Sequence, residues 1–160
     1  MIVLAMDLSL SSPAFAILAK NAKEEKPQLL HLSSVRTNPK RSHGFRLKQI
    51  YDHLEQVLRT EDIEIDAVVS EKGFSRHART TQILFMVHGV ARLGCFVKGY
   101  EVEEMSPTTV KKIVAGNGKA SKEQLADSVR GYFDEELTFK NDDESDAVSV
   151  GVAYFIEKGK

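Results

Sequence analysis

The sequence predicts one α/β domain over residues 1–160, with a mixed five-stranded sheet flanked by helices. Residues 1–6 form a continuous apolar run, which is typical of a strand buried on both faces of a sheet. Strand patterns then recur after short turns, and later ones alternate with helical patterns. Hydrophobic residues make up 42% of the chain and charged residues 28%, so the composition suits a folded core and excludes a disordered chain.

The first half of the chain indicates an antiparallel meander followed by a helix. Strands are expected over residues 14–19 and 28–35, because a turn ending at Pro13 precedes the first and a charged turn precedes the second. A helix is expected to begin near Ser42 or His43, since apolar residues then recur at helical spacing. Those residues are Phe45, Ile50, Leu54, Val57 and Leu58.

The second half indicates strands joined by helices. A short strand is expected over residues 66–71, a long helix over 80–98 and a strand over 100–105. Ser106-Pro107 and Ser121, with Gln124 three residues on, are helix-start signals, and the last helix is expected from about Asp142 to Glu157. The order of three strands, helix, strand, helix, strand and further helices is that of a ribonuclease H-like fold.

Cysteine content and charge bear on the compartment and on partners. The lone Cys95 excludes a disulfide framework, and the apolar run at residues 1–6 is too short for a membrane span, so we expect a cytoplasmic protein without a membrane partner. The net charge is only −1, but basic residues gather over residues 36–48 and 72–122. They form either a basic face or ordinary solvated helix surfaces.

Four acids stand at the ends of predicted elements. Asp7 ends the first strand and Glu71 the fourth, and ligands of open α/β sheets gather at the carboxyl ends of parallel strands. Asp143 and Asp146 are three residues apart on one helix face, so all four acids can reach one pocket. Each acid also has an ordinary alternative, as a solvated strand end or as a charge that complements a helix N-terminus.

Carboxylates that converge in one pocket remain ionised when divalent cations neutralise their charge. Oxygen ligands favour Mg²⁺, with Mn²⁺ as a substitute, over zinc. Two such ions can activate a water and stabilise the leaving oxygen of a phosphodiester.

The sequence resembles the RuvC-type Holliday junction resolvases over nearly its whole length. The resemblance rests on the aspartate that ends the first strand, on Glu71 followed by Gly73-Phe74, and on the run Asp-Glu-Ser-Asp-Ala at 143–147. Residues 110–122 add the most specific match, a lysine, a Gly-x-Gly and a second lysine without a gap. The sequence departs from the family at Asp7-Leu8-Ser9, where Asp-Pro-Gly is frequent, and Asp142 leaves the third acid ambiguous by one residue.

The resemblance implies a homodimeric, Mg²⁺-dependent endonuclease that cuts four-way DNA junctions by paired symmetric nicks with ligatable ends. It implies metal ligands at Asp7, Glu71, Asp143 and Asp146. Lys111 and Lys122 correspond to a backbone-binding and a catalytic lysine, and Phe74 to an aromatic that stacks on an unpaired base. Arg76 and Arg79, which follow Phe74, are candidates for phosphate contacts, or else lie in a solvated loop. A phage-encoded member and a branch-migration motor as partner are both compatible with the sequence.

Other functions compete with junction resolution. The same metal site could serve a nuclease of branched DNA in general, or of RNA, and a junction-binding module without cleavage belongs to a different class. A phosphate-binding P-loop at 116–120 is rejected, because Ile113 stands at its first glycine and no Ser or Thr follows Lys119. A sugar-kinase-like ATPase needs a second similar domain. The wide apolar surface of the helix at 80–98 is the candidate dimer interface.

Overall fold

The computed structural model describes residues 1–23, 25–60, 62–73 and 75–159. Its elements are β1 Ile2–Asp7, β2 Ala14–Ala19, β3 Gln28–Ser34, α1 His43–Leu58, β4 Ala67–Glu71, α2 Ala78–Val97, β5 Val102–Met105, α3 Pro107–Ala115, α4 Lys122–Arg130 and α5 Asp142–Lys158.

One mixed sheet carries the fold, with its strands in the order β3-β2-β1-β4-β5. β1 pairs antiparallel with β2, and β2 antiparallel with β3, whereas β1–β4 and β4–β5 are parallel. The predicted five-stranded, helix-flanked architecture with an opening meander is therefore confirmed. Because β1 and β4 are parallel neighbours, their carboxyl ends lie at the same edge of the sheet.

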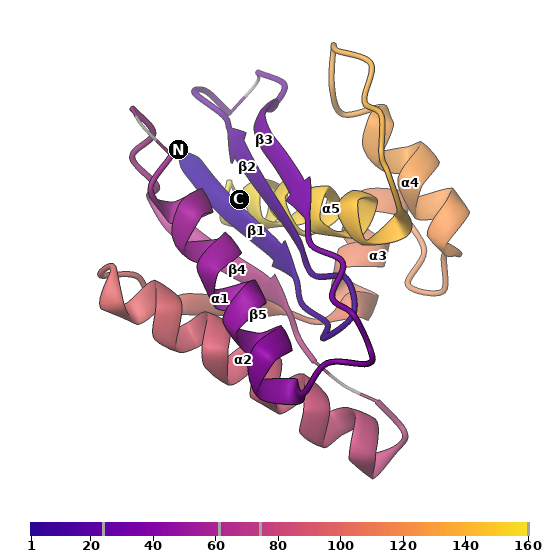
Figure 1. Ribbon diagram of the computed structural model, residues 1–160. Coiled ribbons are helices and arrows are strands. Elements are labelled where there is room, and N and C mark those ends of the chain that lie inside the picture. Colours follow the sequence, from indigo (N-terminus) through magenta and orange to yellow (C-terminus); the bar gives the residue numbers. More distant parts are fainter. Residues whose placement is uncertain (24, 61, 74, 160) are drawn as a thin grey trace.

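Helices cover both faces of the sheet (Figure 1). On one face, α1 and α2 pack together over a core that contains Leu4, Met6 and Ile17. On the other face, α5 crosses β1 and β2, with α3 and α4 packed against it. A Cβ at Gly151 of α5 would lie 2.5 Å from Leu18 Cδ1, so a larger residue here would require the Leu18 side chain to shift where the helix approaches the sheet.

The predicted helix starts agree with the structure. The Ser106 side chain accepts from the Thr109 amide and Pro107 occupies the first turn of α3, while Ser121 and Gln124 form a reciprocal capping box on α4. The fifth strand begins two residues later than its expected start at residue 100. The Tyr100 amide still donates to the Cys95 carbonyl in the turn that closes α2, so β5 begins at Val102.

Much of the surface of α2 is exposed. This helix buries Val87, Ala91 and Cys95 in the core but leaves Phe85, Leu93 and Phe96 at least 60% exposed. By length and composition alone α2 could cross a membrane, whereas in this fold it packs against α1. Its outward face is therefore apolar surface that the described part of the chain does not cover.

Candidate active site

Two of the acids are brought together by strand register. β1 and β4 pair as far as Met6 with Ser70, so the next residues, Asp7 and Glu71, lie side by side at the end of the parallel pair. Side chains alternate along a strand, and those of Asp7 and Glu71 lie on the same face as the core residues Ala5 and Val69. That is the face covered by α5, and the two carboxylates therefore point toward its first turns.

The other acids come from the start of α5. The Asn141 side chain caps this helix by accepting from the Glu144 amide, and Asp143 and Asp146 follow one turn apart. Oxygen atoms of Asp7, Asp143 and Asp146 lie within 4.8 Å of one another, an arrangement able to hold a metal ion. Asp142 is exposed and lies outside this group. An all-oxygen donor set fits Mg²⁺ or Mn²⁺.

The acids raise one another's pKa values. Burial, followed by the charges of Glu71, Asp146 and Asp143, raises the pKa of Asp7 well above its usual range. Burial and the charge of Asp146 raise the pKa of Glu71 to about 7, and burial likewise raises the pKa of Asp146 to about 6. Without a cation these groups repel one another near neutral pH, which is the electrostatic condition that favours cation binding.

Two lysines stand beside the acids. The Lys122 ammonium, at the start of α4, lies 3.9 Å from Asp146 Oδ2 and its side chain is 63% exposed. Lys111 of α3 is half-buried, and its charge lowers the pKa values of both Glu71 and Asp146. The two lysines singled out in the sequence thus face the acids from two different helices, with one of them open to solvent.

Hydrogen bonds hold the turn that follows Asp7, where the sequence has Leu8-Ser9. The Ser12 amide donates to Ser9 Oγ at 3.0 Å, and the Thr37 hydroxyl donates to the Leu10 carbonyl. The Thr37 amide also donates to the Ser11 carbonyl at 2.9 Å. None of the residues 8–13 has a positive φ, so the turn does not require a glycine.

This turn also reaches the acids. The Ser12 hydroxyl donates to Asp143 Oδ2 at 2.6 Å, which orients a carboxylate of the cluster. Sequence reasoning missed Ser12, and it missed the buried Glu144 and its partner Ser34 as well. Only the acid run at 142–146 marked Glu144, and a serine in a turn carries no signal of which distant group it contacts.

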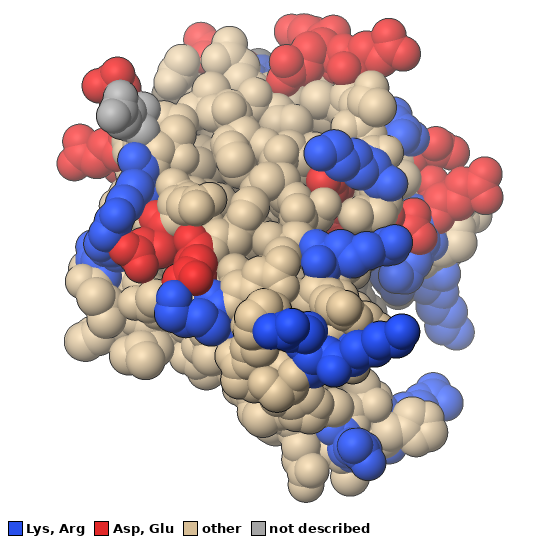
Figure 2. Space-filling view, viewed as in Figure 1, with Lys and Arg blue, Asp and Glu red and all other residues tan. Residues whose placement is uncertain are grey.

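The remaining candidates lie around the loop that follows β4. Phe74 falls outside the described residues, while Arg76 and Arg79 are exposed just before and within the first turn of α2. Lys and Arg side chains gather along the side where the β3–α1 connection, α3, α4 and the start of α2 lie (Figure 2). Of the two alternatives for these residues, the structure favours a basic side of the molecule near the acids.

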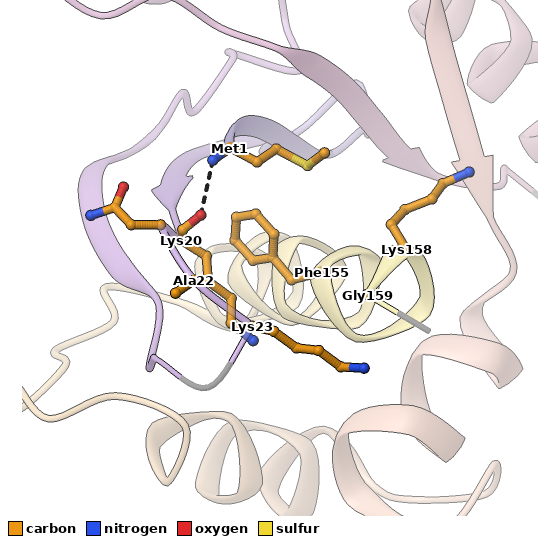
Figure 3. A pocket seen from close by; sticks show the side chains of 8 residues that line it. Met1, Lys20, Ala22, Lys23, Phe155, Lys158 and Gly159 are labelled. Atoms are coloured by element: carbon orange, nitrogen blue, oxygen red, sulfur yellow. Dashed lines mark hydrogen bonds between the residues drawn. The ribbon is translucent and has the colours of Figure 1, made fainter.

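A second hollow lies at the opposite end of β1. It is lined by Met1, Lys20, Lys23, Phe155 and Lys158, among others, and the Met1 amine donates to the Lys20 carbonyl (Figure 3). None of the described residues that line it is an acid. Since a strand rises about 3.3 Å per residue, roughly 20 Å separates Met1 at this hollow from Asp7. The two sites are therefore separate.

The fold and the carboxylate cluster define a nuclease of the ribonuclease H-like class. Residues 3–154 match the family model described as "Crossover junction endodeoxyribonuclease RuvC". The chain therefore belongs to the RuvC family, and the cluster agrees with the metal dependence of these nucleases.

Individual relatives agree with this assignment. The chain is 30% identical over 160 residues to the crossover junction endodeoxyribonuclease RuvC of Rickettsia rickettsii (strain Sheila Smith), covering 99% of both chains. It is 28% identical over 155 residues to that of Alkaliphilus metalliredigens (strain QYMF), covering 96% of this chain and 92% of the relative.

Solved structures give the same result. T. thermophilus RuvC in complex with Holliday junction substrate superimposes with a TM-score of 0.86 at 26% identity, over 99% of this chain and 95% of that one. The fowlpox virus resolvase bound to Holliday junction DNA matches with a TM-score of 0.59 at 16% identity over the whole of both chains, which shows a shared fold.

Proposed function

We propose that this chain, as a single endonuclease domain over residues 1–160, resolves four-way DNA junctions by cutting two opposed strands symmetrically and leaving ligatable nicks. The observation that carries the proposal is the cluster of Asp7, Asp143 and Asp146, beside a basic side of the molecule. Glu71 lies outside that group of three but next to Asp7, at the carboxyl end of the neighbouring parallel strand. The names of the RuvC relatives and the junction complex of the T. thermophilus protein support the choice of substrate.

In this proposal Asp7, Glu71, Asp143 and Asp146 hold two Mg²⁺ ions, for which Mn²⁺ substitutes. Such ions, when bound, supply an activated water and neutralise charge on the leaving oxygen. The acids fix the position of that chemistry, and Ser12 keeps one Asp143 oxygen oriented. Asp143 is preferred to Asp142, because Asp142 is exposed outside the cluster.

The lysines and the loop after β4 act on the DNA in this proposal. The exposed ammonium of Lys122 faces the scissile phosphate and stabilises the charge that develops there, while Lys111 contacts the backbone. Arg76 and Arg79 are free of ion pairs among the described residues and bind neighbouring phosphates. Phe74 stacks on a base near the crossover.

A homodimer completes the proposed enzyme, because two opposed strands require two sites related by a twofold axis. The exposed residues Phe85, Gly89, Leu93 and Phe96 form a stripe along one side of α2. Beyond the neighbouring backbone of α2 itself, a Cβ at Gly89 would meet no described atom within 4 Å, so a second helix could approach closely there. We propose that a second copy, in the cytoplasm, covers this stripe rather than lipid.

Asp7→Asn and Glu71→Gln test the proposal on an immobile four-way junction, a Y-fork and a linear duplex, each with and without Mg²⁺. Because the metal site supplies several kcal/mol of transition-state stabilisation, cleavage is expected to fall about a thousandfold in both variants. Junction binding measured without metal is expected to stay within about threefold of the wild type, since neither acid contacts phosphate directly.

Asp142→Asn is the matched control, an adjacent acid outside the cluster, and it is expected to cleave like the wild type. Paired nicks confined to the junction would support resolution. Equal cutting of forks would replace it with a general branched-DNA nuclease, and tight binding without cleavage in either Mg²⁺ or Mn²⁺ would mean a binding module.

A further inference from the structure

A row of paired residues runs across the sheet beneath the start of α5. Asp7 of β1 pairs with Ala14 of β2, and Ala14 pairs with Ser34 of β3. Directly paired residues point to the same face, so the side chains of Asp7 and Ser34 both face α5, two strands apart. With strands about 4.8 Å apart, their backbones lie roughly 10 Å from each other.

The buried Glu144 of α5 contacts Ser34, at the far end of this row. It is 2% exposed, and the Ser34 hydroxyl donates to its Oε2 at 2.7 Å while the Lys140 amide donates to its Oε1 at 3.0 Å. The Asn141 side chain completes the group by donating to Ser34 Oγ at 3.3 Å and accepting from the Glu144 amide at 2.9 Å. No lysine, arginine or histidine of the described chain forms an ion pair with Glu144.

A buried carboxylate without a cation is stabilised only when its oxygens accept hydrogen bonds. Both oxygens of Glu144 do so, and the N-terminus of α5 favours a negative charge in the first turn. These contacts are directional, whereas apolar side chains allow a helix to slide or rotate over a sheet. Glu144 therefore specifies how the first turn of α5 lies on β3.

Asp143 and Glu144 follow one another on the helix and so project about 100° apart. Asp143 points to Asp7 and accepts from Ser12, whereas Glu144 points to Ser34. The first turn of α5 is thus bonded to two separate places, the turn between β1 and β2 through Ser12 and the strand β3 through Ser34. Two separated contacts fix the rotation as well as the position of that turn.

We propose that Glu144, through Ser34, is a positioning residue that holds Asp143 and Asp146 in register with Asp7 for cation binding. Glu144 is not itself a ligand in this proposal, since it is buried against β3 and lies outside the group formed by Asp7, Asp143 and Asp146. The inference rests on the proposed function only in that the acids of the cluster bind a divalent cation.

Ser34→Ala, Glu144→Gln and Glu144→Ala test the inference, with Mn²⁺ alone as the probe and its free concentration measured by electron paramagnetic resonance. Loss of a residue that orients a ligand costs about 10- to 100-fold in metal affinity, which is the weakening expected for Glu144→Ala. Ser34→Ala removes one of two hydrogen bonds and is expected to weaken binding about tenfold. Glu144→Gln keeps an acceptor and a donor and is expected to stay within about threefold.

A helix that is merely destabilised would not give this pattern. Val150→Ala removes buried methyl groups from the middle of α5 and should lower Tm while leaving the Mn²⁺ affinity unchanged. Cleavage by Ser34→Ala should also recover at raised Mn²⁺ concentration, because the ligands remain present.

Wild-type Mn²⁺ affinity in Ser34→Ala would overturn the inference, even where Glu144→Ala fails to fold, and so would an equal loss in Val150→Ala. Equal binding by the wild type and Asp7→Asn would instead overturn the metal site on which the proposed function depends.

Discussion

The two longest helices lie on opposite faces of the sheet and differ in what covers them. Eleven of the seventeen residues of α5 are buried, because the sheet lies under it and α3 and α4 pack beside it. Only five of the twenty residues of α2 are buried, although α2 is the more apolar of the two. Apolar composition alone therefore does not say what a helix packs against.

The difference in burial between α5 and α2 corresponds to a difference in what the two helices do. α5 begins with acids that meet the carboxyl ends of the strands, so its burial fixes their geometry. α2 instead presents a wide apolar stripe, and stripes of this size on a folded chain mark interaction surfaces. One helix serves the site within the chain, and the other is available to a second copy.

The largest effect expected from this comparison is on assembly. The double variant Phe85→Lys with Phe96→Lys would place like charges in the centre of the proposed interface, because both side chains are exposed there. Since buried aromatic residues contribute about 2 kcal/mol or more each, the double variant is expected to weaken the dimer at least a hundredfold. Sedimentation equilibrium at micromolar concentration measures this as a halved mass with an unchanged circular dichroism spectrum.

Leu30→Lys is the control, because Leu30 is 42% exposed on the edge strand β3, away from α2. It should leave the mass unchanged. If the wild-type protein is already monomeric at that concentration, the exposed stripe of α2 is not a dimer interface and the prediction is wrong.

A smaller effect is expected on stability. Val150 of α5 is fully buried, so Val150→Ala should lower the free energy of unfolding by about 2 kcal/mol through lost burial and a cavity. Leu93 of α2 is 60% exposed, and Leu93→Ala should change the stability of the separated monomer by no more than about 0.5 kcal/mol. Urea unfolding at protein concentrations below the dissociation constant of the dimer measures the free energy of unfolding of both variants. Similar losses would mean that α2 is covered within its own chain.

Much of this arrangement could be predicted from local patterns. Apolar runs, Ser106-Pro107 and the Ser121 cap predicted the elements and their order, and β1 and β4 could be paired because crossover connections favour parallel neighbours. The acids at strand ends followed from that pairing, and the structure brings Asp7, Asp143 and Asp146 together. Their roles as ligands stay predictions.

The contacts that orient the acids could not be predicted in this way. Ser12 lies 131 residues from Asp143 in sequence, and Ser34 lies 110 residues from Glu144. Such pairs depend on strand register and on helix rotation, neither of which leaves a periodic signal. The start of β5 was misplaced for a local reason, because the turn closing α2 extends to Tyr100.

The smallest predicted effect concerns pH and the acids that meet the first turns of α5. Burial and Asp146 raise the pKa of Glu71 to about 7, so the folded protein binds a proton that the unfolded chain, with a pKa near 4.5, has lost. This contribution to stability is complete below about pH 4.5 and is lost as pH rises through 7.

In EDTA, Glu71→Gln is therefore expected to exceed wild-type stability by about 1–2 kcal/mol at about pH 8 and to match it at about pH 4. His31, His53 and His88, whose pKa values burial lowers, act in the opposite direction below about pH 6.5 and cancel in this difference because both proteins contain them. Thermal unfolding of both proteins across this range, repeated with Mg²⁺, measures the effect. An advantage for Glu71→Gln that is independent of pH would show that ionisation of the buried Glu71 is not its cause.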